Sequence, residues 1–205
     1  MHIAITGNIG AGKTTLARLL AQHYGWDVLE EAVEGNPYLK DFYEDMERWS
    51  FNLQIYFLNS RFEQVIRIRE SGRSVVQDRT IYEDAFIFAK NLFDSGLMTE
   101  RDYLTYRTLF DNMLALVRPP DLMIYLRADL PKLTSQIQKR GRDFEKSISE
   151  EYLGNLNRHY EDFIDGYTAG NLLVIDVSQV DYAARPEDLQ AIIRQVDATL
   201  TNVSV

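Results

Sequence analysis

Short apolar runs alternate with longer amphipathic segments along the chain. Five of the short runs have the length of buried strands: residues 2–6, 26–30, 74–77, 122–126 and 172–176. The longer segments repeat apolar residues at intervals of three and four, which predicts helices over residues 13–24, 49–70, 82–95, 99–117, 131–140, 149–167 and 186–200. Buried strands that alternate with helices indicate an α/β fold, in which a five-stranded parallel sheet carries helices on both faces.

The pattern predicts a single domain over residues 1–205, with no internal repeat and no linker. In a parallel sheet, ligands bind beyond the carboxyl ends of the strands. The residues that follow the predicted strands should therefore converge in space. They are the segment 7–14, Glu30 and Glu31, Asp78 and Arg79, and Asp176.

A glycine-rich loop joins the first predicted strand to the first predicted helix. It satisfies the pattern G-x-x-x-x-G-K-[ST] with Gly7, Asn8, Ile9, Gly10, Ala11, Gly12, Lys13 and Thr14, and Thr15 follows. Glycines let backbone N–H groups turn inward around phosphate oxygens, and the helix directs its positive end at the same place. We expect this P-loop to hold the phosphates of ATP, with Lys13 on the β- and γ-phosphates and the Thr14 hydroxyl on Mg²⁺.

The charge and composition of the chain narrow its partners and its location. With 22 basic and 31 acidic residues the net charge is −9, and a negative surface argues against nucleic acid as a partner. The lack of cysteine excludes disulfides, thiolate catalysis and cysteine-ligated zinc. No apolar run approaches the roughly 18–20 residues of a membrane span, and the N-terminus lacks the pattern of a signal peptide. These features predict a cytoplasmic protein.

Charged residues follow the second and third predicted strands. Asp78 can help to hold magnesium through water and Arg79 can stabilise a transferred phosphoryl group, although a structural ion pair explains these two residues equally well. Glu30 or Glu31 can accept the proton of an attacking hydroxyl, whereas a solvated strand end is the simpler explanation for the pair alone. Taken alone, these residues remain candidates for phosphoryl-transfer chemistry.

Several motifs in order resemble the deoxyribonucleoside kinases, the family that includes deoxycytidine, deoxyguanosine and deoxyadenosine kinases. The matching stretches are GNIGAGKTT, EEAVEGNPYL, FYEDMERWSFNLQIYFLNSRF, DRTIYEDAFIFAKNL, KRGRDFEK and EEYLGNL. The NPY segment after Glu34 is most similar to the bacterial deoxyadenosine and deoxyguanosine kinases. The resemblance implies a P-loop kinase fold with an arginine-containing lid over about residues 139–149.

The resemblance also implies roles for the residues beyond the second and third strands. Glu31 stands in a Glu-Ala-Val match to the family's Glu-Pro-Val motif, which implies that it is the general base, with Glu30 as the competing carboxylate. Arg79 stands in Asp-Arg-Thr, a match that implies contact with the 5′-oxygen and the phosphate.

On the donor side, the resemblance implies that Arg140 and Arg142 of the lid close over the phosphates. Gln136 stands where the family has a further lid arginine. Composition alone would explain this charged loop by solvation. The residues implied for the donor-base region are Asp176, Asp181 and Tyr182.

Helix spacing predicts a pocket for the nucleoside that accepts the phosphoryl group. Gln54 and Arg61 are seven residues apart and share one helix face, as do Asp84 and Phe88, which are four apart. An amphipathic helix with polar outer residues is the simpler explanation of the first pair by itself. The resemblance implies that Gln54 and Asp84 bind the edge of the nucleoside base and that Arg61 is the charged partner of Asp84. Phe88 offers a ring that can stack on the base.

The sugar site follows from the resemblance too. Tyr43 and Glu151 match the pair that binds the 3′-hydroxyl, which leaves no partner for a ribose 2′-hydroxyl and favours a deoxy sugar. Simpler explanations are that Tyr43 is a half-buried tyrosine and that Glu151 is an acid favoured in the first turn of a helix by the helix dipole.

These features predict an Mg²⁺-dependent kinase that phosphorylates the 5′-hydroxyl of a deoxyribonucleoside with ATP. Deoxyadenosine is favoured, with deoxyguanosine and deoxycytidine as alternatives. A nucleoside-monophosphate kinase of the thymidylate kinase type shares the P-loop, but it needs cationic groups for the acceptor phosphate. A non-catalytic nucleotide-dependent switch is the remaining alternative, and it would show no acceptor-dependent ADP release. The resemblance implies a homodimer through the predicted helices 49–70 and 82–95.

Overall fold

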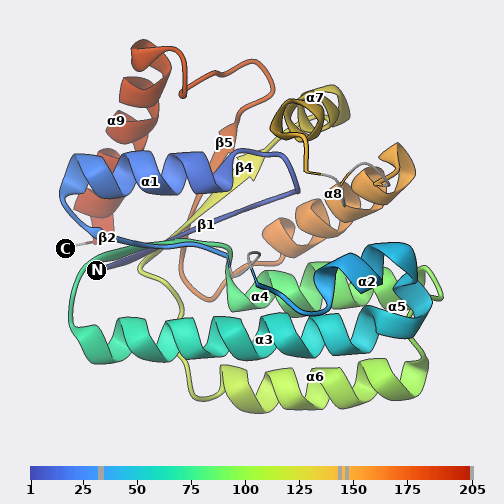
Figure 1. Ribbon diagram of the computed structural model, residues 1–205. Coiled ribbons are helices and arrows are strands. Elements are labelled where there is room, and N and C mark those ends of the chain that lie inside the picture. The colour runs from blue at the N-terminus through green and yellow to red at the C-terminus, as the bar shows by residue number, and fades with distance from the viewer. Residues whose placement is uncertain (32–34, 143–144, 146–147, 204–205) are drawn as a thin grey trace.

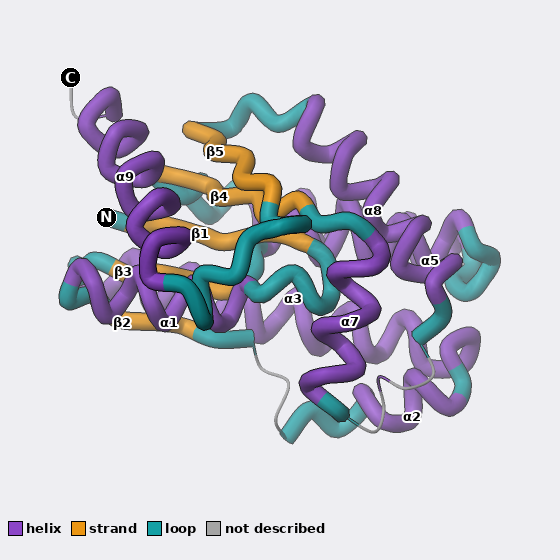
Figure 2. The backbone as a smooth tube through the Cα atoms, turned by 90° about the horizontal axis from the view of Figure 1, so that it is seen from above, coloured by secondary structure: helices purple, strands orange, loops and turns teal. Residues whose placement is uncertain are grey.

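Five parallel strands form the sheet of the structure, a computed structural model that describes residues 1–31, 35–142, 145 and 148–203. The strands are β1 His2–Gly7, β2 Asp27–Leu29, β3 Val75–Asp78, β4 Leu122–Arg127 and β5 Asn171–Asp176. They lie in the order β2-β3-β1-β4-β5, which Figure 2 shows from above, and every neighbouring pair is parallel. The predicted α/β class and five-stranded parallel sheet are therefore confirmed.

Helices cover both faces of this sheet. α1 Lys13–Tyr24 and α9 Pro186–Val203 lie on one side, and α3 Met46–Ser71 lies on the other together with α6 (Figure 1). The remaining helical segments are α2 Leu39–Glu44, α4 Ile81–Glu83, η1 Asp84–Ala89, α5 Lys90–Asp94, α6 Glu100–Leu114, α7 Leu130–Arg140 and α8 Glu150–Asp165. Among the described residues, no helix is both long and apolar enough to cross a membrane.

Burial explains why the central strands are uninterrupted apolar runs. Ile3 and Ile5 of β1 have no exposed surface, and the five residues of β4 from Leu122 to Leu126 are at most 1 % exposed. Strands buried on both faces lose the alternation of a half-exposed sheet. At the edge of the sheet the constraint relaxes, and Val174 of β5 is 36 % exposed. The core therefore lies around β1 and β4, whose carboxyl ends carry the P-loop and α7.

The structure contains one helix that was not predicted, α2, and it moves the start of the predicted helix 49–70. α2 was not predicted, because two apolar residues in six positions, Leu39 and Phe42, are too few to reveal a helical period. Both side chains are buried in a small cluster with Leu53 of α3. α3 begins at Met46 and not at residue 49, because the Asp45 side chain accepts the backbone N–H of residue 48 and caps the helix.

The helix predicted over residues 82–95 is divided into α4, η1 and α5. A capping box opens α4: the Thr80 hydroxyl accepts the Glu83 N–H, and the Glu83 carboxylate accepts the Thr80 N–H at 2.8 Å. η1 is a π-helical segment, and it contains both Asp84 and Phe88. Such segments are frequent at functional sites, and a three-to-four period in the sequence does not distinguish them from an α-helix.

The burial pattern generates a prediction for two leucines. Leu58 of α3 has no exposed surface, whereas Leu116 is 62 % exposed. Leu58→Ala should lower the free energy of unfolding by about 2–5 kcal/mol, because it removes buried methyl groups and leaves a cavity. Leu116→Ala, the same chemical change at the surface, should lower it by about 0.5 kcal/mol or less. Urea denaturation measures both values, and equal losses would contradict this description of the core.

Candidate functional site

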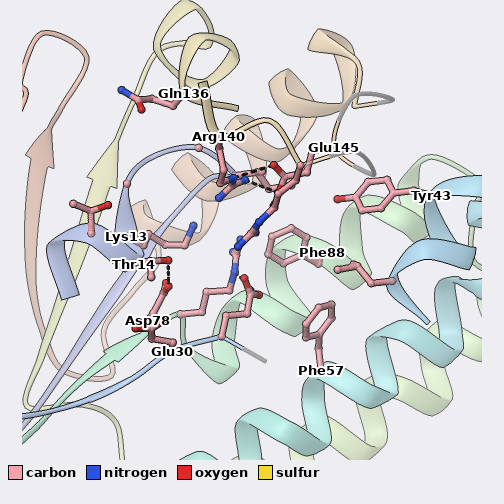
Figure 3. A pocket seen from close by; sticks show the side chains of 18 of the residues that line it. Lys13, Thr14, Glu30, Tyr43, Phe57, Asp78, Phe88, Gln136, Arg140 and Glu145 are labelled. Atoms are coloured by element: carbon pink, nitrogen blue, oxygen red, sulfur yellow. Dashed lines mark hydrogen bonds and ion pairs between the residues drawn. The ribbon is translucent and has the colours of Figure 1, made fainter. Parts of the chain in front are cut away.

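A cleft of about 640 Å³ opens at the carboxyl edge of the sheet. Lys13, Thr14 and Asp78 lie at one end of it, and the aromatic rings of Phe57 and Phe88 lie toward the other (Figure 3). The predicted site residues that line the cleft are Ile9, Gly10, Gly12, Lys13, Thr14, Thr15, Glu31, Tyr43, Gln54, Asp78, Arg79, Asp84, Phe88, Arg140 and Arg142. Those that do not line it are Gly7, Asn8, Ala11, Arg61, Glu151, Asp176, Asp181 and Tyr182. The expected convergence is therefore present for the P-loop, for Glu30 and Glu31 and for Asp78 and Arg79, whereas Asp176 does not line the cleft.

The P-loop makes a tight connection between β1 and α1. Gly12 precedes α1 with a φ of 93°, in the left-handed region that favours glycine. A Cβ atom at this position would lie 2.0 Å from the Tyr182 hydroxyl. That hydroxyl donates to the Ala11 carbonyl oxygen at 3.3 Å. Gly12 is therefore required both by its backbone conformation and by the close approach of Tyr182.

The side chains of Lys13 and Asn8 tie the P-loop together. Lys13 Nζ donates to the Asn8 carbonyl oxygen at 2.9 Å. The Asn8 side-chain amide donates to Leu153 O at 3.0 Å and to Asn157 Oδ1 at 2.6 Å, which fastens the loop to α8. Burial, reinforced by the charge of Arg79, lowers the pKa of Lys13 to about 8. Lys13 thus remains mostly charged at neutral pH, in a loop whose N–H groups and helix start already favour anions.

Thr14 and Asp78 are suited to a divalent cation. Thr14 Oγ1 donates to Asp78 Oδ2, while Asp78 Oδ1 is buried without a hydrogen-bond partner among the described residues. The same part of the chain contains no group of three His, Asp or Glu side chains that could hold a metal. Mg²⁺ does not need such a group, because it keeps several waters and binds substrate phosphates with one or two protein ligands. A hydroxyl beside an unsatisfied carboxylate oxygen fits that manner of binding.

Glu30 and Glu31 are adjacent after β2, but they have different partners. The Glu30 carboxylate accepts two hydrogen bonds from Arg18 of α1, at 2.5 and 2.6 Å. Glu31 Oε1 lies 2.6 Å from Arg79 Nε and 3.5 Å from Arg61 Nη2. Burial by itself would raise the pKa of Glu31, but the charges of the two arginines outweigh it and lower the pKa to about 2. Glu31 is therefore a carboxylate at neutral pH and lies among the cations of the site.

Gln54 and Asp84 both line the cleft. Gln54 Oε1 and Asp84 Oδ2 are buried without a hydrogen-bond partner among the described residues, and Asp84 Oδ2 lies 3.6 Å from Arg61 Nε. Burial raises the pKa of Asp84 to about 7, against the opposing charge of Arg61. A side-chain amide and a carboxyl group on one wall suit a ligand group that carries N–H donors.

Arg61 lies behind this wall. It is 2 % exposed, and its Nε lies 3.6 Å from Asp84 Oδ2, so the predicted charged pair is present. Its Nη1 donates to the Asp78 carbonyl oxygen at 3.0 Å and its Nη2 to Glu31 at 3.5 Å. Because these contacts occupy the guanidinium, Arg61 supports Asp84 and does not itself reach the cleft. This corrects its expected place among the residues that contact substrate.

Glu145, and not the predicted Glu151, lines the cleft with Tyr43 (Figure 3). Glu145 is 4 % exposed. Burial raises the pKa of Tyr43, and the charge of Glu145 adds to the shift. Glu151 is exposed on the first turn of α8, while its neighbour Tyr152 lines the cleft. Successive helix residues point about 100° apart, so both cannot face the cleft.

The lid arginines also meet Glu145. Arg140 donates to the two Glu145 carboxylate oxygens at 2.9 and 2.5 Å, and Arg142 donates at 3.4 Å (Figure 3). Gln136 and Lys139 of α7, three residues apart, line the cleft beside them. Residues 143, 144, 146 and 147 of the predicted lid lie outside the described residues, as do residues 32 and 33 of the Glu-Ala-Val motif.

The three predicted donor-base residues shape the loop after β5. Asp176 Oδ1 accepts the Ser178 N–H at 2.9 Å, and Asp181 Oδ1 accepts the Ala184 N–H at 3.1 Å. Tyr182 is buried against the P-loop. Their expected contact with the donor base stays a prediction.

Two buried acids of the site, Glu83 and Glu145, were not predicted. Glu83 has no exposed surface and accepts a hydrogen bond from Arg79 Nη1 at 3.1 Å. Its spacing of four residues from Arg79 is a signal that could have identified the pair. Glu145 stands within the stretch KRGRDFEK, but an acid in a charged loop has no periodic signal of its own. Their burial, visible only in the structure, distinguishes them from solvated charges.

Comparisons with known proteins find related sequences and structures. Residues 3–201 match the family described as deoxynucleoside kinase. The chain is 40% identical over 202 residues to the deoxyadenosine/deoxycytidine kinase of Bacillus subtilis (strain 168), covering 97% of this chain and 92% of that protein. It is 50% identical over 163 residues to the deoxyadenosine kinase of Dictyostelium discoideum, covering 80% of this chain and 66% of that protein. It also resembles the structure of deoxyadenosine kinase from M. mycoides with the products dCMP and a flexible dCDP bound. That match has a TM-score of 0.86 and 32% identity, and it covers 97% of this chain and 100% of the other.

The geometry of Gly12 generates a prediction for nucleotide binding. In Gly12→Ala the new methyl group meets the Tyr182 hydroxyl, and alanine is strained at a φ of 93°, so the P-loop or Tyr182 must shift and the phosphate-binding conformation is disturbed. We expect the Kd for ATP, measured by calorimetry, to rise at least about tenfold. Gly25→Ala is the matched control, because Gly25 has a φ of 67° and nothing lies within 4 Å of its Cβ position. Wild-type affinity in Gly12→Ala would show that this loop does not hold the phosphates.

Proposed function

Because the chain belongs to the deoxynucleoside kinase family, we propose that it transfers the γ-phosphoryl group of ATP to the 5′-hydroxyl of deoxyadenosine. Deoxycytidine and deoxyguanosine are the further acceptors we propose. The product is a deoxynucleoside 5′-monophosphate, as in nucleotide salvage. One observation carries the proposal: the P-loop, the Glu31 carboxylate and the polar side chains of Gln54 and Asp84 share one cleft.

Glu31 is the proposed acceptor of the 5′-hydroxyl proton. Its arginine neighbours keep it ionised, so one of its oxygens can accept a hydrogen bond from the hydroxyl throughout the physiological pH range. A loose phosphoryl-transfer transition state demands little basicity, which is compatible with a pKa of about 2. Orientation of the attacking oxygen is therefore the main contribution of Glu31. Glu30 is held by Arg18 and takes no part in this step.

Cationic groups stabilise the charge on the transferred phosphoryl group. Lys13 reaches the β- and γ-phosphates, Arg79 contacts the phosphate near the 5′-oxygen, and Arg140 with Arg142 closes over the donor. Arg140 can turn from Glu145 to the phosphates without leaving the cleft, because both side chains line it. Water exclusion by the closed lid favours transfer to the nucleoside over hydrolysis of ATP.

Mg²⁺ is the metal we propose, since Thr14 and Asp78 fit it. Thr14 Oγ1 would ligate the ion directly, and Asp78 would hold it through water with Oδ1, which has no hydrogen-bond partner in the part of the chain that the structure describes. When bound, the ion would neutralise charge on the β- and γ-phosphate oxygens.

Recognition of the base rests on Gln54 and Asp84. The amide oxygen of Gln54 and the carboxyl group of Asp84 match the exocyclic amino group that adenine and cytosine carry, whereas thymine presents a carbonyl oxygen there. A carbonyl facing these acceptors in a dry pocket costs about 1–3 kcal/mol. The names of the relatives support this choice: one acts on deoxyadenosine and deoxycytidine, and another is a deoxyadenosine kinase whose structure holds dCMP.

Tyr43 and Glu145 form the proposed site for the sugar 3′-hydroxyl. Both line the cleft, whereas the exposed Glu151 does not. A carboxylate and a phenol can together accept and donate to one hydroxyl. This arrangement supports a preference for deoxynucleosides over ribonucleosides, because the proposal includes no partner for a ribose 2′-hydroxyl.

The thymidylate kinase alternative requires cations around an acceptor phosphate. The acceptor end is lined by neutral or acidic side chains such as Gln54, Tyr43, Asp84 and Phe57, which suit an uncharged nucleoside. A non-catalytic switch is disfavoured by the family match, which identifies a phosphotransferase.

A homodimer through α3 and the α4–α5 segment and a cytoplasmic location are further parts of this proposal. Partly buried aromatic side chains on α3, such as Phe51 and Phe62, provide apolar surface next to the core. Light scattering coupled to size-exclusion chromatography tests the dimer, and a monomer at micromolar concentration would refute it.

ADP release against a panel of acceptors tests the proposed reaction. The panel contains deoxyadenosine, deoxycytidine, deoxyguanosine, thymidine, adenosine and deoxyadenosine monophosphate. We expect the highest kcat/KM for deoxyadenosine, a poor value for thymidine, and a lower value for adenosine than for deoxyadenosine. A preference for a monophosphate would support the thymidylate kinase type, and ADP release independent of acceptor would support the switch.

Replacement of each glutamate separates the two carboxylates after β2. Glu31→Gln keeps the shape but removes the charge that orients the 5′-hydroxyl, so kcat should fall about 10²-fold or more. Glu30→Gln is the matched control on the adjacent residue and should change kcat far less, because Glu30 contacts Arg18 at the edge of the cleft. A larger loss in Glu30→Gln would show that Glu31 is not the base.

The pKa of Asp84 generates a prediction about pH. A pKa of about 7 means that Asp84 is mostly neutral at pH 6 and mostly ionised at pH 8. The ionised form accepts from an amino group, whereas the neutral form can donate to a thymine carbonyl. The ratio of kcat/KM for deoxyadenosine to that for thymidine should therefore rise up to about tenfold from pH 6 to pH 8.

A ratio is the appropriate readout, because titration of Lys13 affects both substrates equally and cancels. Asp84→Asn is the control, and its ratio should not vary with pH. A constant ratio in the wild-type protein would contradict the assignment of Asp84 to the base.

A further inference from the structure

Arg79 is held in an unusual backbone conformation. Its φ of 70° is in the left-handed region, and among the described residues it is the only non-glycine residue with a positive φ. Its N–H donates to the Ile5 carbonyl oxygen at 2.9 Å, which keeps the residue against the end of β1. Strained residues persist only where their surroundings fix them, and they cluster at functional sites.

Two buried side chains from different elements fix one edge of the Arg79 guanidinium. Arg79 Nη1 donates to Glu83 Oε1 and to the Tyr160 hydroxyl, both at 3.1 Å. Neither Glu83 nor Tyr160 has any exposed surface. The Tyr160 hydroxyl also lies 2.6 Å from Glu83 Oε1 and 2.8 Å from the Gly7 carbonyl oxygen, to either of which it can donate its single proton.

This arrangement connects three parts of the site. Glu83 belongs to α4 and caps it by accepting the Thr80 N–H at 2.8 Å with its other oxygen. Tyr160 belongs to α8, the helix that follows the lid, and Gly7 is the first residue of the P-loop. The orientation of Arg79 is thereby linked to the loop that holds ATP and to the helix that follows the lid.

The second terminal nitrogen of the guanidinium, Nη2, is available to a ligand in the cleft. Arg79 lines the cleft, its Nε lies 2.6 Å from Glu31, and in the described part of the chain no hydrogen bond engages its Nη2. We propose that Glu83 and Tyr160 are positioning residues that hold Arg79 so that its remaining N–H groups meet the transferred phosphoryl group. The inference rests on the proposed kinase function, since it assigns these residues to that reaction.

Stability alone does not explain the arrangement. The capping box needs only a glutamate or glutamine at the third helical position, so the negative charge of Glu83 is not required to begin α4. A buried ion pair is weak support for a fold, because well-packed apolar groups often replace it without loss. The charge of Glu83 and the hydroxyl of Tyr160 are needed if the Arg79 guanidinium must be held in one orientation.

Steady-state kinetics of Tyr160→Phe and Glu83→Gln test the proposal in the full chain. The first variant removes only a hydroxyl, and the second keeps the cap but removes the charge. We expect kcat to fall about 10- to 100-fold, because a small misplacement of a group that contacts the reacting atoms lowers the rate by this order. KM for ATP and for deoxyadenosine should change less than about threefold. Tyr125→Phe is the matched control: Tyr125 stacks on Tyr160 and its hydroxyl bonds Glu161 of the same helix at 2.9 Å, but it does not contact Arg79. Its kcat should remain within about twofold of wild type. Wild-type kcat in both test variants would overturn the proposal.

A double-mutant cycle with Arg79→Lys separates positioning from a general effect on structure. If Tyr160 acts through the guanidinium, Tyr160→Phe should cost little further kcat in the Arg79→Lys background. An equal loss in both backgrounds would mean that Tyr160 supports the fold and does not position Arg79, which also overturns the proposal.

A spectroscopic readout does not depend on activity. With ¹⁵N labelling, the Arg79 signals are identified by their loss in Arg79→Lys, and restricted rotation should give separate Nη1 and Nη2 signals in the wild type. These signals should merge in the Glu83→Gln/Tyr160→Phe double variant, and unchanged signals would contradict positioning. If the wild type transfers phosphate to no nucleoside, the proposed function fails, while this measurement still decides whether the two residues hold Arg79.

Discussion

The ion pair between Glu31 and Arg79 is the interaction on which the rest of the site depends. It joins the carboxyl ends of β2 and β3 at 2.6 Å, and Arg61 and Glu83 extend it into a buried cluster of alternating charge. Each charge in this cluster would be costly to bury alone, and removal of one partner from a buried pair typically costs about 3–5 kcal/mol. The charges stabilise one another because the parallel sheet brings these strand ends to the same edge, beside the P-loop and Lys13.

The same cluster explains how the site can respond to its substrates. Glu31 is ionised because arginines surround it, and Arg79 is held on its other side by Glu83. A 5′-hydroxyl that approaches Glu31 and a phosphate that approaches Arg79 can each take over part of this existing pairing. The protein therefore need not create charge at the moment of transfer, because oriented groups are already present. The proposed base recognition by Asp84 would be coupled to the cluster as well, since Arg61 contacts both Glu31 and Asp84.

Local sequence signals predicted the parts of this arrangement that are contiguous or periodic. The P-loop and the strand pattern predicted the sheet edge and its phosphate end, and the spacing of Asp84 and Phe88 placed both on the cleft wall. Adjacent acids such as Glu30 and Glu31 could not be separated by sequence spacing. Their difference lies in their partners, which are Arg18 of α1 for Glu30 and Arg79 after β3 with Arg61 of α3 for Glu31. The prediction of Glu151 for the cleft met a related difficulty, since Glu151 is exposed on α8 and the buried acid that lines the cleft is Glu145. The π-helical segment and the left-handed φ of Arg79 are likewise set by tertiary packing.

A crystal structure of the protein with deoxyadenosine and a non-hydrolysable ATP analogue would test this account most directly. The account predicts the nucleoside 5′-oxygen within about 2.6–3.2 Å of a Glu31 oxygen, with Arg79 still bonded to Glu83 and directed at the γ-phosphate. A 5′-oxygen that contacts Glu30, or that lies away from both carboxylates while Glu31 stays paired with Arg79, would contradict it.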